Sequence, residues 1–85
     1  MYITNLPLLD DYIKKSGYRR DHIANFLGMS RASFIYRMTG KVDFTITDVN
    51  KLRILLNLSD ADIIKIFFPT MLNDNHVLSN ETANI

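Results

Sequence analysis

Residues 20–41 constrain the fold of this 85-residue chain more than any other part, because their small, capping and helix-ending residues have the spacing of two short helices joined by a turn. Ala24 is small enough for two helices to cross closely, and Gly28 allows a backbone turn that residues with side chains resist. Ser30 can cap a second helix, which Gly40 would end. The segment therefore predicts two short helices, 20–27 and 31–39, joined by a tight turn at Gly28.

A helix is also predicted before this pair. It begins near Leu6, with Pro7 in the first turn where the missing N–H costs nothing, and runs to about Ser16. Leu9 and Ile13 share its apolar face with Leu6. In the following helix, Ile23, Ala24 and Leu27 show the spacing of an apolar stripe.

Two more helices are predicted after the pair. Thr45 and Asp48 have the spacing of a capping box, and Asn57 would end the helix that they begin. Ser59 and Asp62 repeat that spacing before a last helix, from residue 60 to about 68. We therefore expect an all-α, compact five-helix domain over residues 1–69. The segment 70–85 has four asparagines and scattered apolar positions, so we expect a mostly flexible tail.

The composition narrows the class of protein. The chain is 47% hydrophobic and 22% charged, which is typical of a soluble globular protein. It has no cysteine, so disulfides, thiol catalysis and thiolate zinc sites are excluded. Residues 1–7 lack the basic and long apolar regions of a secretory signal, and no apolar run approaches the roughly 20 residues of a membrane span. A cytoplasmic location is the expectation.

Charge is unevenly distributed along the chain. The formal net charge is +1, but residues 14–41 contain seven basic residues and one acidic residue, a balance of +6. The remaining residues have three basic and eight acidic side chains, a balance of −5. A local positive field attracts polyphosphates. The alternative is a solvated basic face without a partner.

Residues Arg20 to Lys41 resemble the helix-turn-helix of the phage Cro and repressor group, often called the XRE family. The resemblance continues through 44–49 and 56–60, which are similar to the starts of the fourth and fifth helices in small phage regulators. It implies a lambda-repressor-like fold with the helix-turn-helix at the second and third helices. It also implies a Cro-like repressor of phage or prophage origin that binds a palindromic operator as a dimer and acts in a bacterial cytoplasm, near the nucleoid.

One residue departs from the family pattern. The motif usually has an aliphatic residue three positions after Phe34, where this chain has Arg37, followed by Met38. We expect Met38 to fill the core and Arg37 to face outward.

The resemblance assigns base contacts to the helix that begins at Arg31, because such a helix enters the major groove of DNA. The positions are Arg31, Ala32, Ile35 and Tyr36. A guanidinium matches guanine O6 and N7, although Arg31 could instead contact phosphate. Ala32 and Ile35 suit a thymine methyl, with a core position as the alternative for Ile35. Tyr36 could donate to a base or a phosphate, or pack beside Arg37.

Phosphate contacts position such a protein without specifying sequence. Arg19 and Arg20 stand at the start of a helix, whose free N–H groups also attract phosphate. Further candidates from the resemblance are Ser30, Ser33, Arg37, Thr39 and Lys41. For the two serines, helix capping and solvation are the alternative roles.

The last predicted helix is unusually apolar, with five large residues among positions 63–68. Such residues occupy every side of a helix, so a thin domain cannot bury them all. We expect Ile64, Phe68, Met71 and Leu72 to form a dimer interface. The alternative is that they complete the monomer core or lie under the tail. A tail strand that pairs across a dimer, as in some Cro-like proteins, is another alternative.

An enzyme is not expected, because the chain has no glycine-rich phosphate loop and its histidines, His22 and His76, lie in different regions. No metal or cofactor is expected. His22 is expected on the surface, where it could meet a phosphate. The second functional hypothesis is an antirepressor or antitoxin-type interaction module on the same scaffold, because Ala32, Ile35 and Tyr36 are apolar. Salt dependence separates the two, because phosphate contacts weaken steeply as salt rises.

Overall fold

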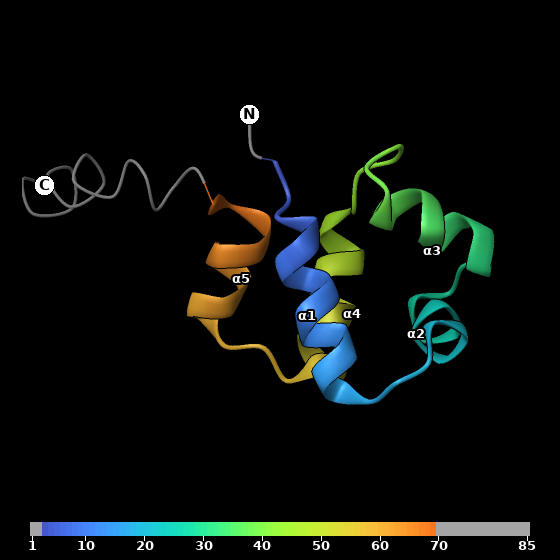
Figure 1. The fold of residues 1–85 in the computed structure, drawn as a ribbon, viewed down its shortest axis with the longest axis horizontal. Helices are drawn as coiled ribbons and strands as arrows, with labels where there is room; N and C mark the ends of the chain where they lie inside the picture. The colour runs from blue at the N-terminus through green and yellow to red at the C-terminus, as the bar shows by residue number, and fades with distance from the viewer. Residues whose placement is uncertain (1–2, 70–85) are drawn as a thin grey trace, which may run out of the picture.

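The computed structural model describes residues 3–69, which form five α-helices and no β-strand (Figure 1). The helices are α1 (Leu6–Ser16), α2 (Arg20–Leu27), α3 (Arg31–Met38), α4 (Ile46–Leu56) and α5 (Asp60–Phe67). The predicted all-α class is confirmed for this part of the chain. The expected tail, 70–85, lies outside the described residues, as do His76 and two of the expected dimer residues, Met71 and Leu72.

Short-range polar contacts define where the helices begin. The side chain of Asn5 accepts a hydrogen bond from the backbone N–H of Leu8 at 3.2 Å, and a proline lies in the first turn of α1. Both predicted capping boxes are present, at the starts of α4 and α5, with each side chain bonded to the other's backbone N–H. These contacts satisfy N–H groups that a helix cannot bond internally.

Left-handed residues end three of the helices. Gly17 follows α1 with φ +79°, Gly28 follows α2 with φ +76°, and Asn57 follows α4 with φ +54°. Glycine adopts this conformation without a steric penalty, and asparagine tolerates it better than most residues. α3 and α5 each end one residue earlier than the sequence predicts, at Met38 and Phe67. Thr39 and Phe68 are instead the C-capping residues of these helices.

The core receives a side chain from every helix. The largest fully buried side chains are one from each helix in turn, namely Leu9, Ile23, Phe34, Leu52 and Ile66. Replacing such a residue by alanine typically costs about 2 to 5 kcal/mol of stability. Met38 is half-buried and packs against this core, as predicted. The fold of residues 3–69 therefore depends on all five helices together.

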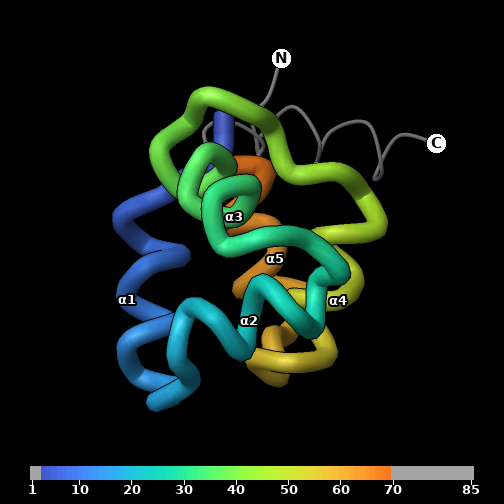
Figure 2. Tube along the Cα trace, turned by 90° about the vertical axis from the view of Figure 1, so that its right-hand side faces the viewer, coloured from blue at the N-terminus to red at the C-terminus, as the bar shows by residue number. Residues whose placement is uncertain are grey.

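The helices divide into two groups that meet at α4. α1, α4 and α5 pack against one another, and α2 packs against both α3 and α4 (Figures 1 and 2). The Tyr12 hydroxyl donates a hydrogen bond to Oδ1 of Asp62 at 2.6 Å, and the Asn5 N–H donates to the Ile66 carbonyl at 2.6 Å. These two bonds join α1 to α5. α3 lies at the far side of the molecule from α5 (Figure 1).

Candidate nucleic-acid interface

The turn between α2 and α3 fixes how α3 is presented. The N–H groups of Gly28 and Met29 donate to carbonyls in the last turn of α2, and the Ser30 side chain accepts from the backbone N–H of Ser33 at 3.1 Å. Phe34 is fully buried on the inner side of α3, and Ala24 of α2 is buried in the same core. The inner face of α3 is thus held in the core, which leaves its opposite face toward solvent.

Three of the four residues predicted to contact bases are exposed: Ala32 and Tyr36 lie opposite Phe34, and Arg31 is the first residue of the helix. The side chain of Arg31 is 65% exposed, Tyr36 is 48% exposed, and Ala32 is exposed. Ile35 is half-buried and lines a surface hollow that α3 forms with the start of α1 and Arg20. Ile35 is neither in the buried core nor fully open to solvent, so its apolar side chain lies at the edge of the exposed face.

Arg31 is engaged by an acidic residue on the neighbouring helix. Its Nε lies 3.4 Å from Oδ1 of Asp21, which belongs to the first turn of α2 and has a 54% exposed side chain. The pair therefore lies at the surface and connects the first turns of α2 and α3. Asp21 is the one acidic residue of segment 14–41, and the sequence carries no signal for its contact with Arg31.

Tyr36 has a cationic neighbour. Nζ of Lys41 lies 5.5 Å from the centroid of the Tyr36 ring, within the range of a cation–π interaction. The backbone N–H of Lys41 donates to the Tyr36 carbonyl at 2.9 Å, and the Thr39 hydroxyl donates to the same oxygen at 3.2 Å. The loop after α3 thus folds back and places Lys41 beside the exposed face of the helix.

The cations near the start of α2 differ in their surroundings. Arg19 is exposed, occupies the N-cap position of α2 and forms no ion pair within residues 3–69. Nη2 of Arg20 binds Oδ1 of Asp10 at 2.7 Å, and Nζ of Lys14 binds Oδ2 of Asp10 at 3.0 Å. The Lys14 hydrogen bond, with a smaller contribution from Arg20, lowers the pKa of Asp10 below its ordinary value.

The expectation that Arg37 faces outward is wrong. Its side chain is 19% exposed, and its Nε donates to Oδ2 of Asp48 at 3.0 Å. Nη1 of Arg37 also donates to the Ser33 carbonyl at 3.3 Å. The reason is that Asp48, which caps α4, is a buried carboxylate facing α3, so the guanidinium gains a partner by turning inward. Arg37 is not available for phosphate in this arrangement.

The two predicted phosphate-contacting serines have structural partners. Ser30 caps α3, and its hydroxyl donates to Oγ of Ser33 at 3.1 Å. Ser33 is half-buried, whereas Ser30 and Thr39 are exposed. The capping role that sequence analysis gave as the alternative is therefore present for Ser30.

In the folded chain, carboxylates from outside the basic segment 14–41 neutralise part of its positive charge. Asp10 and Asp48 lie outside residues 14–41, yet they pair with three of the seven basic residues in it. Within residues 3–69, the cations of this segment that form no ion pair are Lys15, Arg19 and Lys41. The i, i+4 spacing of Asp10 and Lys14 was a sequence signal for one of these pairs. The pairing of Asp48 had no such local signal.

The apolar residues of α5 are buried to different extents. Ile66 and Phe67 are in the core, whereas Ile63, Ile64 and Phe68 are half-buried. Phe68 and Ile63 pack against the core, and the Phe67 ring meets the Phe44 ring edge to face at 5.9 Å. The prediction that one domain cannot bury the whole set is consistent with these exposures. Whether Ile64 and Phe68 contact a second copy stays a prediction.

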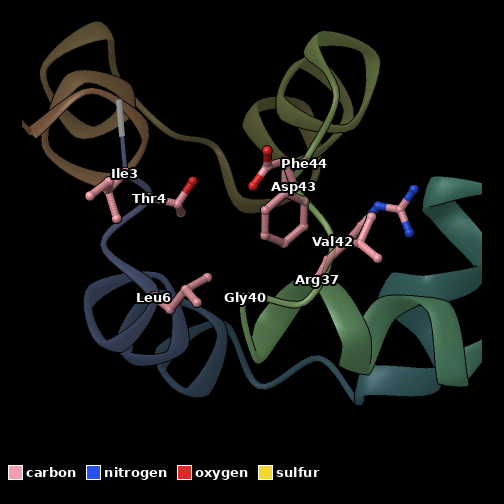
Figure 3. A pocket seen from close by; sticks show the side chains of 8 residues that line it. All are labelled: Ile3, Thr4, Leu6, Arg37, Gly40, Val42, Asp43 and Phe44. Carbon is pink, nitrogen blue, oxygen red and sulfur yellow. The ribbon is translucent and has the colours of Figure 1, made fainter. Parts of the chain in front are cut away.

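Three surface hollows of the described residues have volumes of about 150, 190 and 290 Å³. One of about 150 Å³ lies between the segment before α1 and the loop after α3 (Figure 3). Its lining comes from Ile3, Thr4, Leu6, Arg37, Gly40, Val42, Asp43 and Phe44. Small-molecule sites usually enclose about 300 to 1,000 Å³, so this hollow does not have the size of a typical ligand pocket.

Residues 3–69 contain no group of three or more His, Cys, Asp or Glu side chains placed to hold a metal ion. No helix in this range is long and apolar enough to cross a membrane. His22 is exposed and stacks on Tyr18, with ring centroids 5.1 Å apart.

Comparison with known proteins adds no assignment. No family model matches the chain, and the comparisons with curated proteins and with solved structures likewise give no match.

Proposed function

We propose that the protein is a sequence-specific, double-stranded DNA-binding regulator with a lambda-repressor-like fold, in which α2 and α3 form the helix-turn-helix. The observation that most supports it is the exposed outer face of α3, defined here by Arg31, Ala32 and Tyr36, on a helix whose inner face is anchored by Phe34. An α-helix fits the major groove of B-form DNA, and such a face can contact base edges there.

In this proposal, phosphate contacts flank the exposed face. Arg19 stands at the N-terminus of α2 and Lys41 follows α3, and both are exposed without an ion pair within residues 3–69. The free N–H groups at the start of α2 add attraction for phosphate. Arg20 can join them if phosphate displaces Asp10. Phosphate contacts supply affinity, and Arg31 supplies base discrimination.

A Cro-like protein would act by occupying its operator as a two-fold dimer. We propose that two half-buried residues, Ile64 of α5 and its C-capping residue Phe68, belong to the dimer interface. Because α5 lies across the molecule from α3, a second copy bound there would leave the outer face of α3 accessible (Figure 1).

The competing function is an antirepressor or antitoxin-type interaction module. It is favoured by the apolar character of Ala32, Ile35 and Tyr36, and by the pairing of several basic side chains with carboxylates. Such a contact would respond weakly to salt, whereas each phosphate contact adds about −0.9 to the slope of log K against log salt.

The test is selection of bound sequences from random duplex DNA at low salt, with wild type, Arg31→Ala and Arg53→Ala in parallel. Arg53 is a matched control because it is also exposed and paired with an aspartate, but lies in α4. We expect a palindromic motif for wild type and Arg53→Ala, and loss of preference at one position in each half-site for Arg31→Ala. If wild type selects no sequence, the interaction-module function replaces this proposal.

A further inference from the structure

We propose that Asp21 is a specificity-determining positioning residue, which orients the Arg31 guanidinium toward a base and away from the phosphates. This inference rests on the proposed function and concerns the same face of α3. Asp21 itself is not required to touch DNA.

The first argument is the position of the two residues. Asp21 lies in the first turn of α2, and Arg31 is the first residue of α3. The two helices pack together and share a turn held by hydrogen bonds, so the backbones that bear both side chains are fixed relative to each other. A carboxylate fixed in this way restricts the orientations open to a long and otherwise free arginine.

The second argument is which part of the guanidinium is used. The contact is an ion pair in which Nε of Arg31 lies 3.4 Å from Oδ1 of Asp21. A guanidinium has five N–H donors in a planar fork. With its Nε side facing the carboxylate, the two Nη groups remain as a pair, and guanine O6 and N7 accept such a pair.

The third argument concerns the competing partner. An exposed arginine at the start of this helix can also bind phosphate, which gives affinity without sequence preference. The carboxylate of Asp21 repels phosphate and attracts the guanidinium, so it disfavours the phosphate-bound orientation. An exposed ion pair contributes little to stability, so we expect Asp21 to alter base preference much more than folding.

The experiment measures Kd for the duplex selected by wild type. It also measures Kd for three duplexes in which the base pair at the Arg31-dependent position is replaced by each of the other base pairs. For Asp21→Asn, we expect discrimination at that position to fall about three- to tenfold, with discrimination elsewhere unchanged. Affinity for unrelated duplex DNA at low salt should rise about two- to fivefold, because a negative charge has been removed.

Two further variants distinguish a positioning role of Asp21 from a general effect of its charge or of protein stability. Asp21→Glu keeps the charge and should retain most of the discrimination. Asp60→Asn removes another exposed, arginine-paired aspartate, which lies in α5, and should leave the discrimination unchanged. In an Arg31→Ala background, Asp21→Asn should no longer change base preference.

The inference is overturned if the ratio of Kd values for the replaced and selected duplexes is the same for Asp21→Asn as for wild type. It is also overturned if Asp21→Asn changes this ratio equally with and without Arg31. Failure of wild type to select any sequence would instead overturn the proposed function, and this inference with it.

Discussion

Nε of Arg37 donates a hydrogen bond to Oδ2 of Asp48 at 3.0 Å, and the same carboxylate oxygen accepts from the backbone N–H of Thr45 at 3.0 Å. One buried carboxylate thus caps α4 and binds the last turn of α3. The resemblance to the XRE family leads one to expect an aliphatic residue at position 37. Here an ion pair connects α3 to α4 instead.

Arg37→Ala should lower the free energy of unfolding by about 2 to 3 kcal/mol, because it leaves the Asp48 carboxylate buried without its cation. Urea unfolding followed by circular dichroism measures the change. The double variant Arg37→Met, Asp48→Asn replaces the ion pair by an apolar side chain and retains a capping acceptor, so it should lie within about 1 kcal/mol of wild type. Equal losses in the single and double variants would contradict this account.

Gly28→Ala should destabilise the protein by about 1 kcal/mol, because its φ of +76° is strained for a residue with a Cβ. A Cβ at this position meets only Nζ of Lys51, at an ordinary 3.7 Å, so no steric clash adds to the loss. Gly17→Ala has the same backbone strain and no neighbour within 4 Å, and it is the control for thermal and urea unfolding. A loss at Gly28 well above that at Gly17 would point to a packing role.

The bond between Tyr12 and Asp62 should make stability depend on pH at both extremes. The Tyr12 hydroxyl donates to Asp62, and this bond raises the pKa of Tyr12 above its ordinary value. The same bond, together with the Ser59 backbone N–H, lowers the pKa of Asp62. The Asp62 contribution is therefore present above about pH 4 and is lost as pH falls through its lowered pKa. The Tyr12 contribution is present below about pH 10 and is lost as pH rises through its raised pKa.

Thermal unfolding of wild type and Tyr12→Phe from pH 2 to 11 tests this prediction. The difference in Tm between them should be largest near neutrality and shrink toward both ends. Asp10 has a lowered pKa of its own, so both proteins should still lose stability in acid. A Tm difference that stays constant with pH would contradict the assigned bond.

Asp10→Asn should strengthen DNA binding if the proposed function is correct. The carboxylate of Asp10 binds Arg20 and Lys14, so its removal frees two cations for phosphate. We expect affinity for duplex DNA to rise about two- to fivefold at 50 mM salt, with a steeper salt slope. Asp11→Asn is the matched control, because it changes the net charge equally at an adjacent exposed residue without an ion pair in residues 3–69. Equal effects of the two variants would show that only net charge matters.

The helices could be predicted because their signals are local. Capping residues such as Thr45 and Asp48 act within one turn, and Gly28 and Asn57 end helices through their own backbone conformation. The buried positions of α2 follow from the spacing of apolar residues along a helix. The arrangement of the helices around α4 depends on contacts between distant residues, which such patterns do not specify.

The candidate site was less predictable for the same reason. The exposure of Ala32 and Tyr36 follows from the burial of Phe34 on the opposite side of α3, and Arg31 is exposed as the first residue of that helix. By contrast, the inward orientation of Arg37 depends on Asp48, eleven residues away, and the charge count of 14–41 took no account of Asp10. A count of charges along a sequence omits the carboxylates that folding brings to a basic segment.

The N–H of Asn5, which donates to the Ile66 carbonyl, has a consequence for following the opening of the molecule. This amide stands ahead of the first helix, where backbone protons commonly exchange rapidly with solvent, yet its acceptor is sixty-one positions further along the chain. Its deuterium uptake therefore reports loss of the contact between the start of α1 and the last turn of α5. A single resonance can thus follow whether the first and last helices stay joined.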